Sequence, residues 1–187
     1  MTRNRADCSA GFTMLEALVV MAVLGTLAAL SAPSLMALRE KHQMQSQGEL
    51  FLSSLQLARS QALQRQKRVM VCLRDAGDVC TSQGSWAQGW VVFVDDNGNA
   101  VLDGQEQRLQ VQGPAPAFLR MTGNTPVRRY VSYGPEGRSQ SVSGALLFGT
   151  LRLCKPGQSA AWELVINAVG KPRLEAVLLS AAEAEAC

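Results

Sequence analysis

Histidine is almost absent from this sequence of 187 residues, and its scarcity limits the chemistry available. The single histidine, His42, falls in a stretch that is predicted to be helical, so the sequence offers no Ser-His-Asp or Cys-His pair for nucleophilic catalysis. It also lacks the Cys-x-x-Cys spacing of a metal site, and its glycine-rich segments have no phosphate-loop pattern. We therefore predict that the protein is not an enzyme and uses no cofactor.

Charge of one sign is not in excess either. The chain has 18 Lys and Arg against 15 Asp and Glu, so bulk charge gives no reason to expect a nucleic-acid partner. Charged residues are missing altogether between Ala17 and Leu38. At a helical rise of about 1.5 Å per residue this run spans roughly 33 Å, the thickness of the hydrocarbon core of a membrane. We predict a single membrane-spanning helix.

The basic leader predicts the orientation of that helix. Arg3 and Arg5 outweigh Asp7 before the apolar run. Positive residues stay on the cytoplasmic side, so the N-terminus is predicted to be cytoplasmic and everything after Leu38 periplasmic. The predicted location is the inner membrane, in contact with lipid.

Glu16 is the unusual residue of this segment. A carboxylate at the mouth of a membrane-length helix is costly and calls for a partner. If the chain is cut after Gly11, the new amino terminus at Phe12 lies one helical turn from Glu16. That amine and the carboxylate could neutralise each other within one chain, or set the register between neighbouring chains of a filament.

These residues carry a resemblance. The basic leader, the segment Gly11–Glu16 and the apolar run together resemble the class III signal of type IV pilins and type II secretion pseudopilins. The resemblance implies cleavage between Gly11 and Phe12 by a prepilin peptidase, N-methylation of Phe12 and a role in filament assembly for Glu16. It also implies that other pilins or pseudopilins and an inner-membrane assembly platform are partners.

Helical patterning continues beyond the apolar run. Five apolar residues recur at steps of seven, four, three and four: Met44, Phe51, Leu55, Ala58 and Ala62. We predict one helix from Phe12 to about Gln66. The predicted divisions are a leader (1–11), a membrane or filament-core helix (12–38), an amphipathic helix (39–67) and a β-rich periplasmic domain (68–187).

The period changes to that of strands after Arg68. Short β-branched and aromatic runs separated by turn residues predict six or seven strands; the candidate runs are 69–73, 89–94, 108–111, 129–132, 146–154, 162–166 and 173–179. The predicted fold class is α+β, with a small antiparallel sheet domain packed on the second half of the helix. Trp86, Trp90 and Trp162 could stack on bases, but in these runs at least two are expected in the core.

The predicted β-rich domain makes the resemblance to a known family more specific. The segments 58–62, 69–72, 86–95, 133–138 and 149–154 resemble the GspH/FimT family of minor pilins, so the match covers nearly the whole chain. It implies a structural subunit of a type IV pilus or a type II secretion pseudopilus that acts in filament assembly, at the tip or in priming. The cysteines resemble those of the FimT/FimU pilus branch more than those of the secretion branch.

The number of cysteines is consistent with a periplasmic location of the domain. Cys8 leaves with the leader, so an odd count becomes four, and four cysteines in an oxidising compartment suggest two disulfides. We predict Cys72–Cys80, across a short loop, and Cys154–Cys187, which ties the last residue to a strand. The pairings of Cys72 with Cys154 or with Cys187 stay open.

One loop has the spacing of a calcium site. Oxygen-bearing side chains fall at positions 1, 3, 5, 9 and 12 of a twelve-residue stretch, namely Asp95, Asn97, Asn99, Asp103 and Glu106. Position 6, which calls for glycine, is Ala100, and strands rather than helices flank the loop. An Asp/Asn/Gly-rich hairpin turn explains the same composition. We therefore predict a turn without metal, with calcium as the alternative.

Basic residues supply an alternative function. FimT proteins that act in natural transformation bind DNA through a C-terminal Gly-Arg-x-Arg motif, and the matching positions here are Gly170-Lys171-Pro172-Arg173. Lysine in the first arginine position keeps a charge for phosphate but loses the bidentate fork. Arg128, Arg129 and Arg138 are further candidates. The resemblance thus allows a pilus-borne receptor for double-stranded DNA, whereas strand-edge charges that discourage edge pairing explain the same residues.

Overall fold

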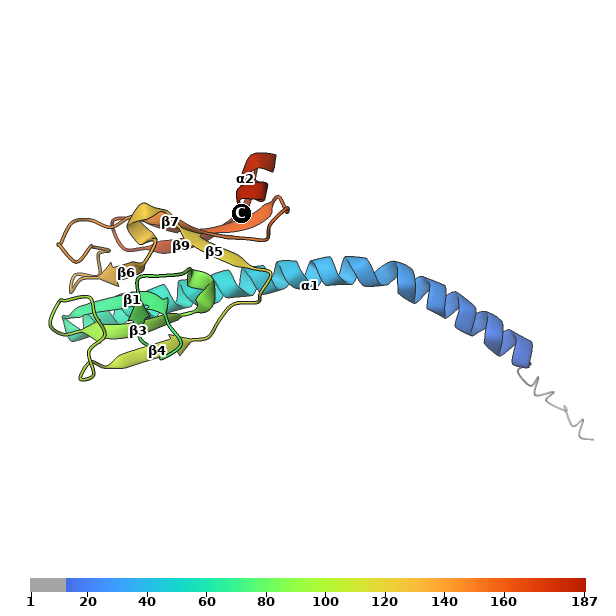
Figure 1. The fold of residues 1–187 in the computed structure, drawn as a ribbon, viewed down its shortest axis with the longest axis horizontal. Helices are drawn as coiled ribbons and strands as arrows, with labels where there is room; N and C mark the ends of the chain where they lie inside the picture. Colours follow the sequence, from blue (N-terminus) through green and yellow to red (C-terminus); the bar gives the residue numbers. More distant parts are fainter. Residues whose placement is uncertain (1–12) are drawn as a thin grey trace, which may run out of the picture. The chain divides into compact units, whose positions relative to one another are not determined.

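The computed structural model describes residues 13–187, apart from the side chains of residues 28–34. The described chain begins with one helix, α1 (Met14–Arg65), and continues into short strands (Figure 1). It divides into two compact units, the first ending at Lys41 and the second running from His42 to Cys187. The C-terminal part of α1 therefore belongs to the same unit as the strands.

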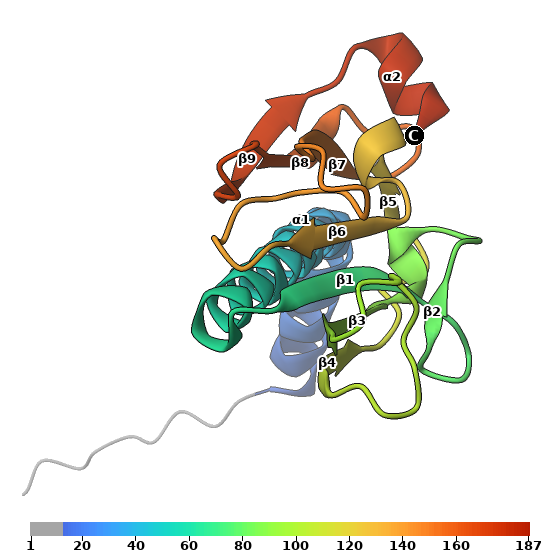
Figure 2. The ribbon, with the colours of Figure 1, turned by 90° about the vertical axis from the view of Figure 1, so that its left-hand side faces the viewer.

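Two antiparallel sheets make up most of the second unit (Figure 2). The first has the order β2-β1-β3-β4, with a further strand, β6, paired to β1; the bounds are β1 (Arg68–Arg74), β2 (Cys80–Thr81), β3 (Trp90–Asp95), β4 (Arg108–Gln112) and β6 (Tyr130–Tyr133). The second has the order β5-β7-β8-β9, with β5 (Arg120–Gly123), β7 (Gly149–Cys154), β8 (Ala160–Ile166) and β9 (Pro172–Leu178). Short helices complete the unit: η1 (Trp86–Gln88), η2 (Thr125–Val127) and α2 (Ala181–Ala186).

The core of this unit is built on the predicted apolar stripe of α1. All five stripe residues are buried together with side chains of both sheets. Phe51 lies edge-on between two tryptophans, with ring centroids 4.9 Å from Trp86 and 4.8 Å from Trp90. The indole of Trp90 donates to Ser54 Oγ at 2.9 Å, so its polar atom is satisfied inside the core. Trp162 is only partly buried, as expected for one of the three.

Alternation along β1 and β3 gives the first sheet a second apolar face. Met70 and Cys72 on β1 and Val91 and Phe93 on β3 form a separate cluster with Leu102 from the loop after β3. The register explains this, because Met70 lies opposite Phe93 and Cys72 opposite Val91. This second cluster fixes one side of the β3–β4 loop against the sheet.

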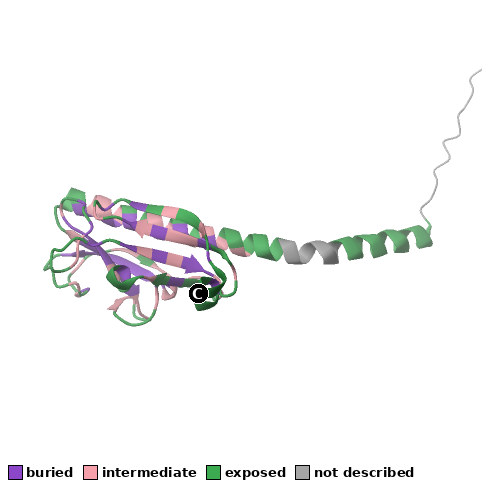
Figure 3. Cartoon of the chain, turned by 90° about the horizontal axis from the view of Figure 1, so that it is seen from above, coloured by how far each residue is buried: buried purple, intermediate pink, exposed green. Residues whose placement is uncertain are grey.

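The N-terminal part of α1 has the opposite character. Every described side chain from Thr13 to Leu27 is exposed (Figure 3), including large apolar ones such as Leu18 and Leu24. In the part of the chain that the structure describes, no helix combines the length and the apolarity needed to cross a membrane. The predicted segment 12–38 extends beyond the described side chains at residue 12 and at residues 28–34, so it stays a prediction.

The predicted fold class is confirmed: an N-terminal helix is followed by a domain of antiparallel strands. The predicted strand set was incomplete, because the structure adds β2 and β5. The strand predicted at 146–154 begins only at Gly149, since Leu146 belongs to an isolated bridge with Gln140. The strands form two sheets.

Candidate functional site

Glu16 lies in the first turn of α1, where a negative charge interacts favourably with the helix dipole. Its backbone N–H donates to Thr13 Oγ1 at 3.2 Å, so Thr13 caps the helix. The Glu16 side chain is exposed. Its predicted partner, the amine of Phe12, and the predicted cleavage point after Gly11 lie outside the described residues.

Around Glu16, the apolar side chains of α1 have no cover from the described part of this chain. Leu15 and Met21 are 73% and 71% exposed. A continuous apolar surface of this kind marks a site of contact with a membrane or another protein. The first turn of α1 therefore places one charged group at the start of an exposed apolar surface.

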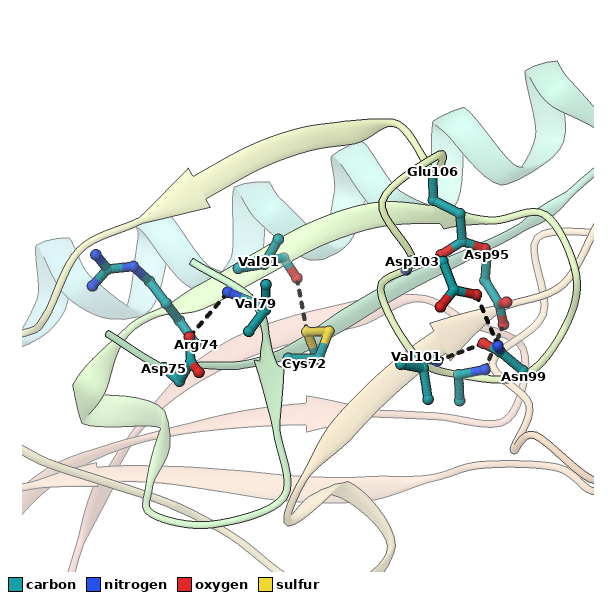
Figure 4. Close-up of a disulfide and its surroundings, with 12 residues drawn as sticks. Cys72, Arg74, Asp75, Val79, Val91, Asp95, Asn99, Val101, Asp103 and Glu106 are labelled. Atoms are coloured by element: carbon teal, nitrogen blue, oxygen red, sulfur yellow. Dashed lines mark hydrogen bonds between the residues drawn. A yellow bond between two sulfur atoms is a disulfide. The ribbon is translucent and has the colours of Figure 1, made fainter. Parts of the chain in front are cut away.

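Both predicted disulfides are present in the structure. Cys72 and Cys80 join β1 to β2 across the loop between them, and Cys154 and Cys187 join β7 to the end of the chain. The Cys72–Cys80 bond lies on the face of the first sheet that also carries the β3–β4 loop (Figure 4). The alternative pairings of Cys72 with Cys154 or Cys187 were wrong.

The C-terminal helix is held by more than its disulfide. Arg152 on β7 donates to Glu163 at 2.8 Å and to Glu183 on α2 at 3.3 Å. The hydrogen bond to Glu163 raises the pKa of Arg152 above its ordinary value. Ser180 caps α2, and its backbone N–H holds the pKa of Glu183 below the usual glutamate range. The end of the chain is thus fixed by one covalent bond and by charge.

The predicted DNA motif lies at the turn from β8 into β9. Gly170 has a φ of +82°, and a Cβ there would come within 2.3 Å of the Gly137 carbonyl oxygen, so only glycine fits. Gly170 also lies against the Arg138 backbone, so the motif begins where this turn packs on the loop after β6. Arg173 pairs with Glu175 at 2.6 Å, so part of its charge is already neutralised.

Arg128 and Arg129 lie elsewhere, at the start of β6. Both are exposed and line an open groove of about 500 Å³ with Tyr130 and Leu146. No direct contact joins them to Lys171 or Arg173 among the interactions of the described residues. DNA contact through the five predicted basic residues stays a prediction.

The candidate calcium loop connects β3 to β4. Ala100, in the position that calls for glycine, has a φ of +63° and so adopts the left-handed conformation a glycine would have there. Within the described residues, no three His, Cys, Asp or Glu side chains are arranged as a metal cluster. The loop side chains are instead joined by hydrogen bonds that involve both asparagines.

Two residues of this region were missed in the sequence. Arg68 lies opposite Asp95 in the β1–β3 register, with Arg68 Nη1 3.9 Å from Asp95 Oδ2. The Arg68–Asp95 pair follows from the pairing of β1 with β3. Local sequence patterns do not determine which strands pair, so the pair could not be predicted from them. Arg59 on α1 donates to the Gly137 carbonyl at 2.9 Å and ties the helix to the turn that supports Gly170.

Comparisons with known proteins agree with this architecture. The family model of the type II transport protein GspH matches residues 47–170, and that of the prokaryotic N-terminal methylation motif matches residues 7–32. Comparison with curated protein sequences gave no match.

Solved structures share the fold. The type IV minor pilin FimU of Pseudomonas aeruginosa superimposes with a TM-score of 0.53 at 20% identity, covering 73% of this chain and 90% of its own. The minor pseudopilin EpsH from the type 2 secretion system of Vibrio cholerae gives 0.51 at 14% identity, covering 72% of this chain and 97% of its own.

The helix, the sheet domain and the methylation motif together define a subunit of the minor pilin and pseudopilin class. The chain belongs to the family of the type II transport protein GspH, whose model covers more than half of its length. The predicted family is thereby confirmed. The methylation motif and the family are those of proteins that are anchored in a membrane and assemble into filaments. None of the comparisons supports a DNA receptor.

Proposed function

We propose that this chain is a minor structural subunit of a type IV pilus or a type II secretion pseudopilus, with Glu16 as the residue that directs assembly. The observation that carries the proposal is the N-terminal part of α1, whose described apolar side chains are all exposed up to Leu27. Lipid covers them before assembly, and the helices of neighbouring subunits cover them afterwards. The role is structural rather than enzymatic.

Processing precedes assembly in this proposal. A prepilin peptidase cuts between Gly11 and Phe12 and methylates the new amino terminus; the methylation motif that spans residues 7–32 supports this step. The N-terminus then lies on the cytoplasmic side of the inner membrane, the globular unit lies in the periplasm, and the assembly platform moves the subunit into the filament. Mass spectrometry of the mature protein should find Phe12 as the first residue, carrying one added methyl group.

Glu16 acts between subunits because nothing in the described part of its own chain uses its carboxylate. In a filament, that carboxylate pairs with the amino terminus of a neighbour and fixes the stagger between helices. Two opposite charges in an apolar surrounding attract strongly, and an unpaired one is costly, so a subunit without the pair is not retained.

The test is a comparison of Glu16→Gln with Glu49→Gln. Glu49 is also an exposed glutamate of α1, but it lies in the second unit and accepts from Gln45 at 2.8 Å. We expect Glu16→Gln to lower the amount in sheared filaments at least about tenfold, with an unchanged amount in membranes and an unchanged melting temperature. Glu49→Gln should assemble normally. Assembly of Glu16→Gln at the wild-type level would contradict the role of Glu16.

A further inference from the structure

The free edge of the second sheet, formed by β9, has no part in the assembly role of α1. β9 (Pro172–Leu178) pairs only with β8 and lies at the rim of its sheet (Figure 2). We propose that this edge binds an extended segment of another subunit of the same filament, which adds to the sheet as a further strand. The inference rests on the proposed function, because it places the partner in the filament.

The backbone of β9 carries a row of hydrogen-bonding groups that face away from β8. Leu179 N donates to Ser159 O at 2.8 Å, next to the register pair of Leu178 with Ala160. Hydrogen-bonded and non-hydrogen-bonded pairs alternate in an antiparallel ladder, so every second residue of β9 points its N–H and C=O away from β8. None of the described residues outside β8 makes a backbone hydrogen bond with these residues, which are Leu174, Ala176 and Leu178. An extended chain is the partner that satisfies such a row.

β9 lacks the protection that other sheet edges of the second unit have. It pairs with β8 over seven consecutive residues without a register shift, whereas the pairing of β4 with β3 contains an irregularity and β2 has only two residues. β6 is covered on its free side by the loop that follows it, because Gln140 N donates to Ser132 O at 3.1 Å. Proteins protect exposed edges by such bulges, short strands and covering loops. A longer regular edge without them is a template for pairing with another chain.

Apolar side chains at the end of β9 also lack cover. Leu174 packs against the core of the second unit and lies against Gly48 of α1. Side chains two and four residues further along a strand lie on the same face, and here Ala176 is exposed and Leu178 is 84% exposed. Leu178 is the most exposed large apolar residue of the second unit. A strand added beside β9 would place its own side chains next to Leu178 and extend the apolar face of the sheet.

Charge on the other face of β9 favours a basic residue in the partner segment. Glu175 lies directly opposite Glu163 of β8, where like charges repel. Glu163 pairs with Arg152, whereas Glu175 pairs with Arg173 of its own strand at 2.6 Å. The Glu175–Arg173 pair is exposed to solvent and so contributes little stability. The partner segment should therefore carry Lys or Arg beside Glu175, together with an apolar residue beside the end of β9.

Two substitutions weaken this edge and leave the hydrogen bonds to β8 in place. Ala176→Pro removes one outward N–H, and an edge strand accepts proline at such a position. Leu178→Lys replaces the exposed leucine with a charge that discourages the addition of a strand. Val101→Lys is the matched control for the second variant, because Val101 is also apolar and 55% exposed but lies in the β3–β4 loop.

The experiment compares the amount of each full-length variant in sheared filaments with its amount in membranes. We expect Ala176→Pro and Leu178→Lys to be incorporated at least about fivefold less than the wild type, which is the effect of one lost hydrogen bond. Val101→Lys should be incorporated normally. Melting temperatures in detergent should be unchanged, and if Ala176→Pro melts lower, Leu178→Lys decides. Normal incorporation of Leu178→Lys beside the wild type would overturn this inference alone, whereas absence of the wild type from filaments would overturn the proposed function as well.

Hydrogen exchange of the wild-type protein tests the edge without any substitution. In detergent, the outward amides of Leu174, Ala176 and Leu178 should exchange quickly, whereas the alternate amides of β9 that face β8 should exchange slowly. In filaments the outward amides should also exchange slowly, because carbonyl groups of the partner accept from them. Fast exchange of the outward amides in filaments would overturn the inference. So would slow exchange already in detergent, since a second copy of this chain would then cover the edge before assembly.

Discussion

The two parts of α1 differ in what covers them, although they belong to one helix. Leu24 in the N-terminal part is 56% exposed, whereas Phe51 in the second unit is fully buried between two tryptophans. Both are large apolar residues of a helix, so hydrophobicity alone does not distinguish them. The second part is covered by its own chain, and the first part is left for other molecules. One helix thus provides the core of a domain and, in the proposed function, the surface for assembly.

The largest expected effect of breaking this contrast comes from Phe51→Ala. It removes a ring from the closed core, so we expect the free energy of unfolding of the second unit to fall by about 3–5 kcal/mol. The matched change Leu24→Ala removes a side chain that its own chain leaves exposed and should change stability by less than about 0.5 kcal/mol. Denaturant titration in detergent, followed by tryptophan fluorescence, measures both. A loss of similar size in the two variants would contradict the contrast.

Within the second unit, the two disulfides can be compared by how much each stabilises the fold, because they close loops of different length. Their cysteines are separated by 33 residues in Cys154–Cys187 and by 8 in Cys72–Cys80. Chain-entropy arguments predict a loss of about 3.7 kcal/mol when the first is removed and about 2.5 kcal/mol when the second is removed. Denaturation of the two double serine variants measures these losses. An equal or reversed order would show that native contacts, not loop length, set the difference.

The smallest expected effect concerns acid and the C-terminal helix. The pKa of Glu183 is lower in the folded chain than in the unfolded one, mainly because of the Ser180 N–H. Its stabilising contribution is therefore complete above the ordinary glutamate pKa of about 4.3 and is lost as the pH falls below it. We expect the amides of α2 to lose hydrogen-exchange protection in this range, while those of β1 do not.

A matched pair of variants isolates that effect. Glu183→Gln should remove the pH dependence of α2, because its side chain cannot lose a charge. Glu185→Gln, two residues away on the same exposed helix, should retain it. Pairing of Arg152 with Glu163 is preserved in both variants, so the sheet beneath should be unaffected.

The sequence was informative where local patterns decide the structure. The spacing of Met44, Phe51 and Leu55 predicted the buried stripe because a helix brings such residues onto one face. Cysteine count and loop length favoured the two disulfides that the structure contains, but left the other pairings of Cys72 open. Strands β2 and β5 were missed because β2 has two residues and because Met121 is the only buried residue of β5. Neither segment shows enough alternation of apolar and polar residues to be recognised as a strand.

Other features depend on contacts between distant segments. The approach of Gly170 to Gly137 follows from how a hairpin turn meets another loop, and no local pattern encodes it. In the sequence, Asp95 was either the first position of a calcium-loop spacing or a turn residue. Its burial became visible only with the pairing of β1 and β3 and with Leu102 packed on the sheet.

The Cys154–Cys187 bond has a mechanical consequence. It closes a covalent ring that contains β8, β9 and α2. Tension applied between α1 and the last residue would pass through the sulfur atoms and bypass that ring. The sequence separation of 33 between the cysteines corresponds to about 110 Å of extended chain, at about 3.3–3.6 Å per residue, which the bond keeps from extending. When single molecules are stretched, their extended length should therefore increase by about that amount after a reductant is added. Oxidation of the two cysteines thus sets how far this subunit can extend under load.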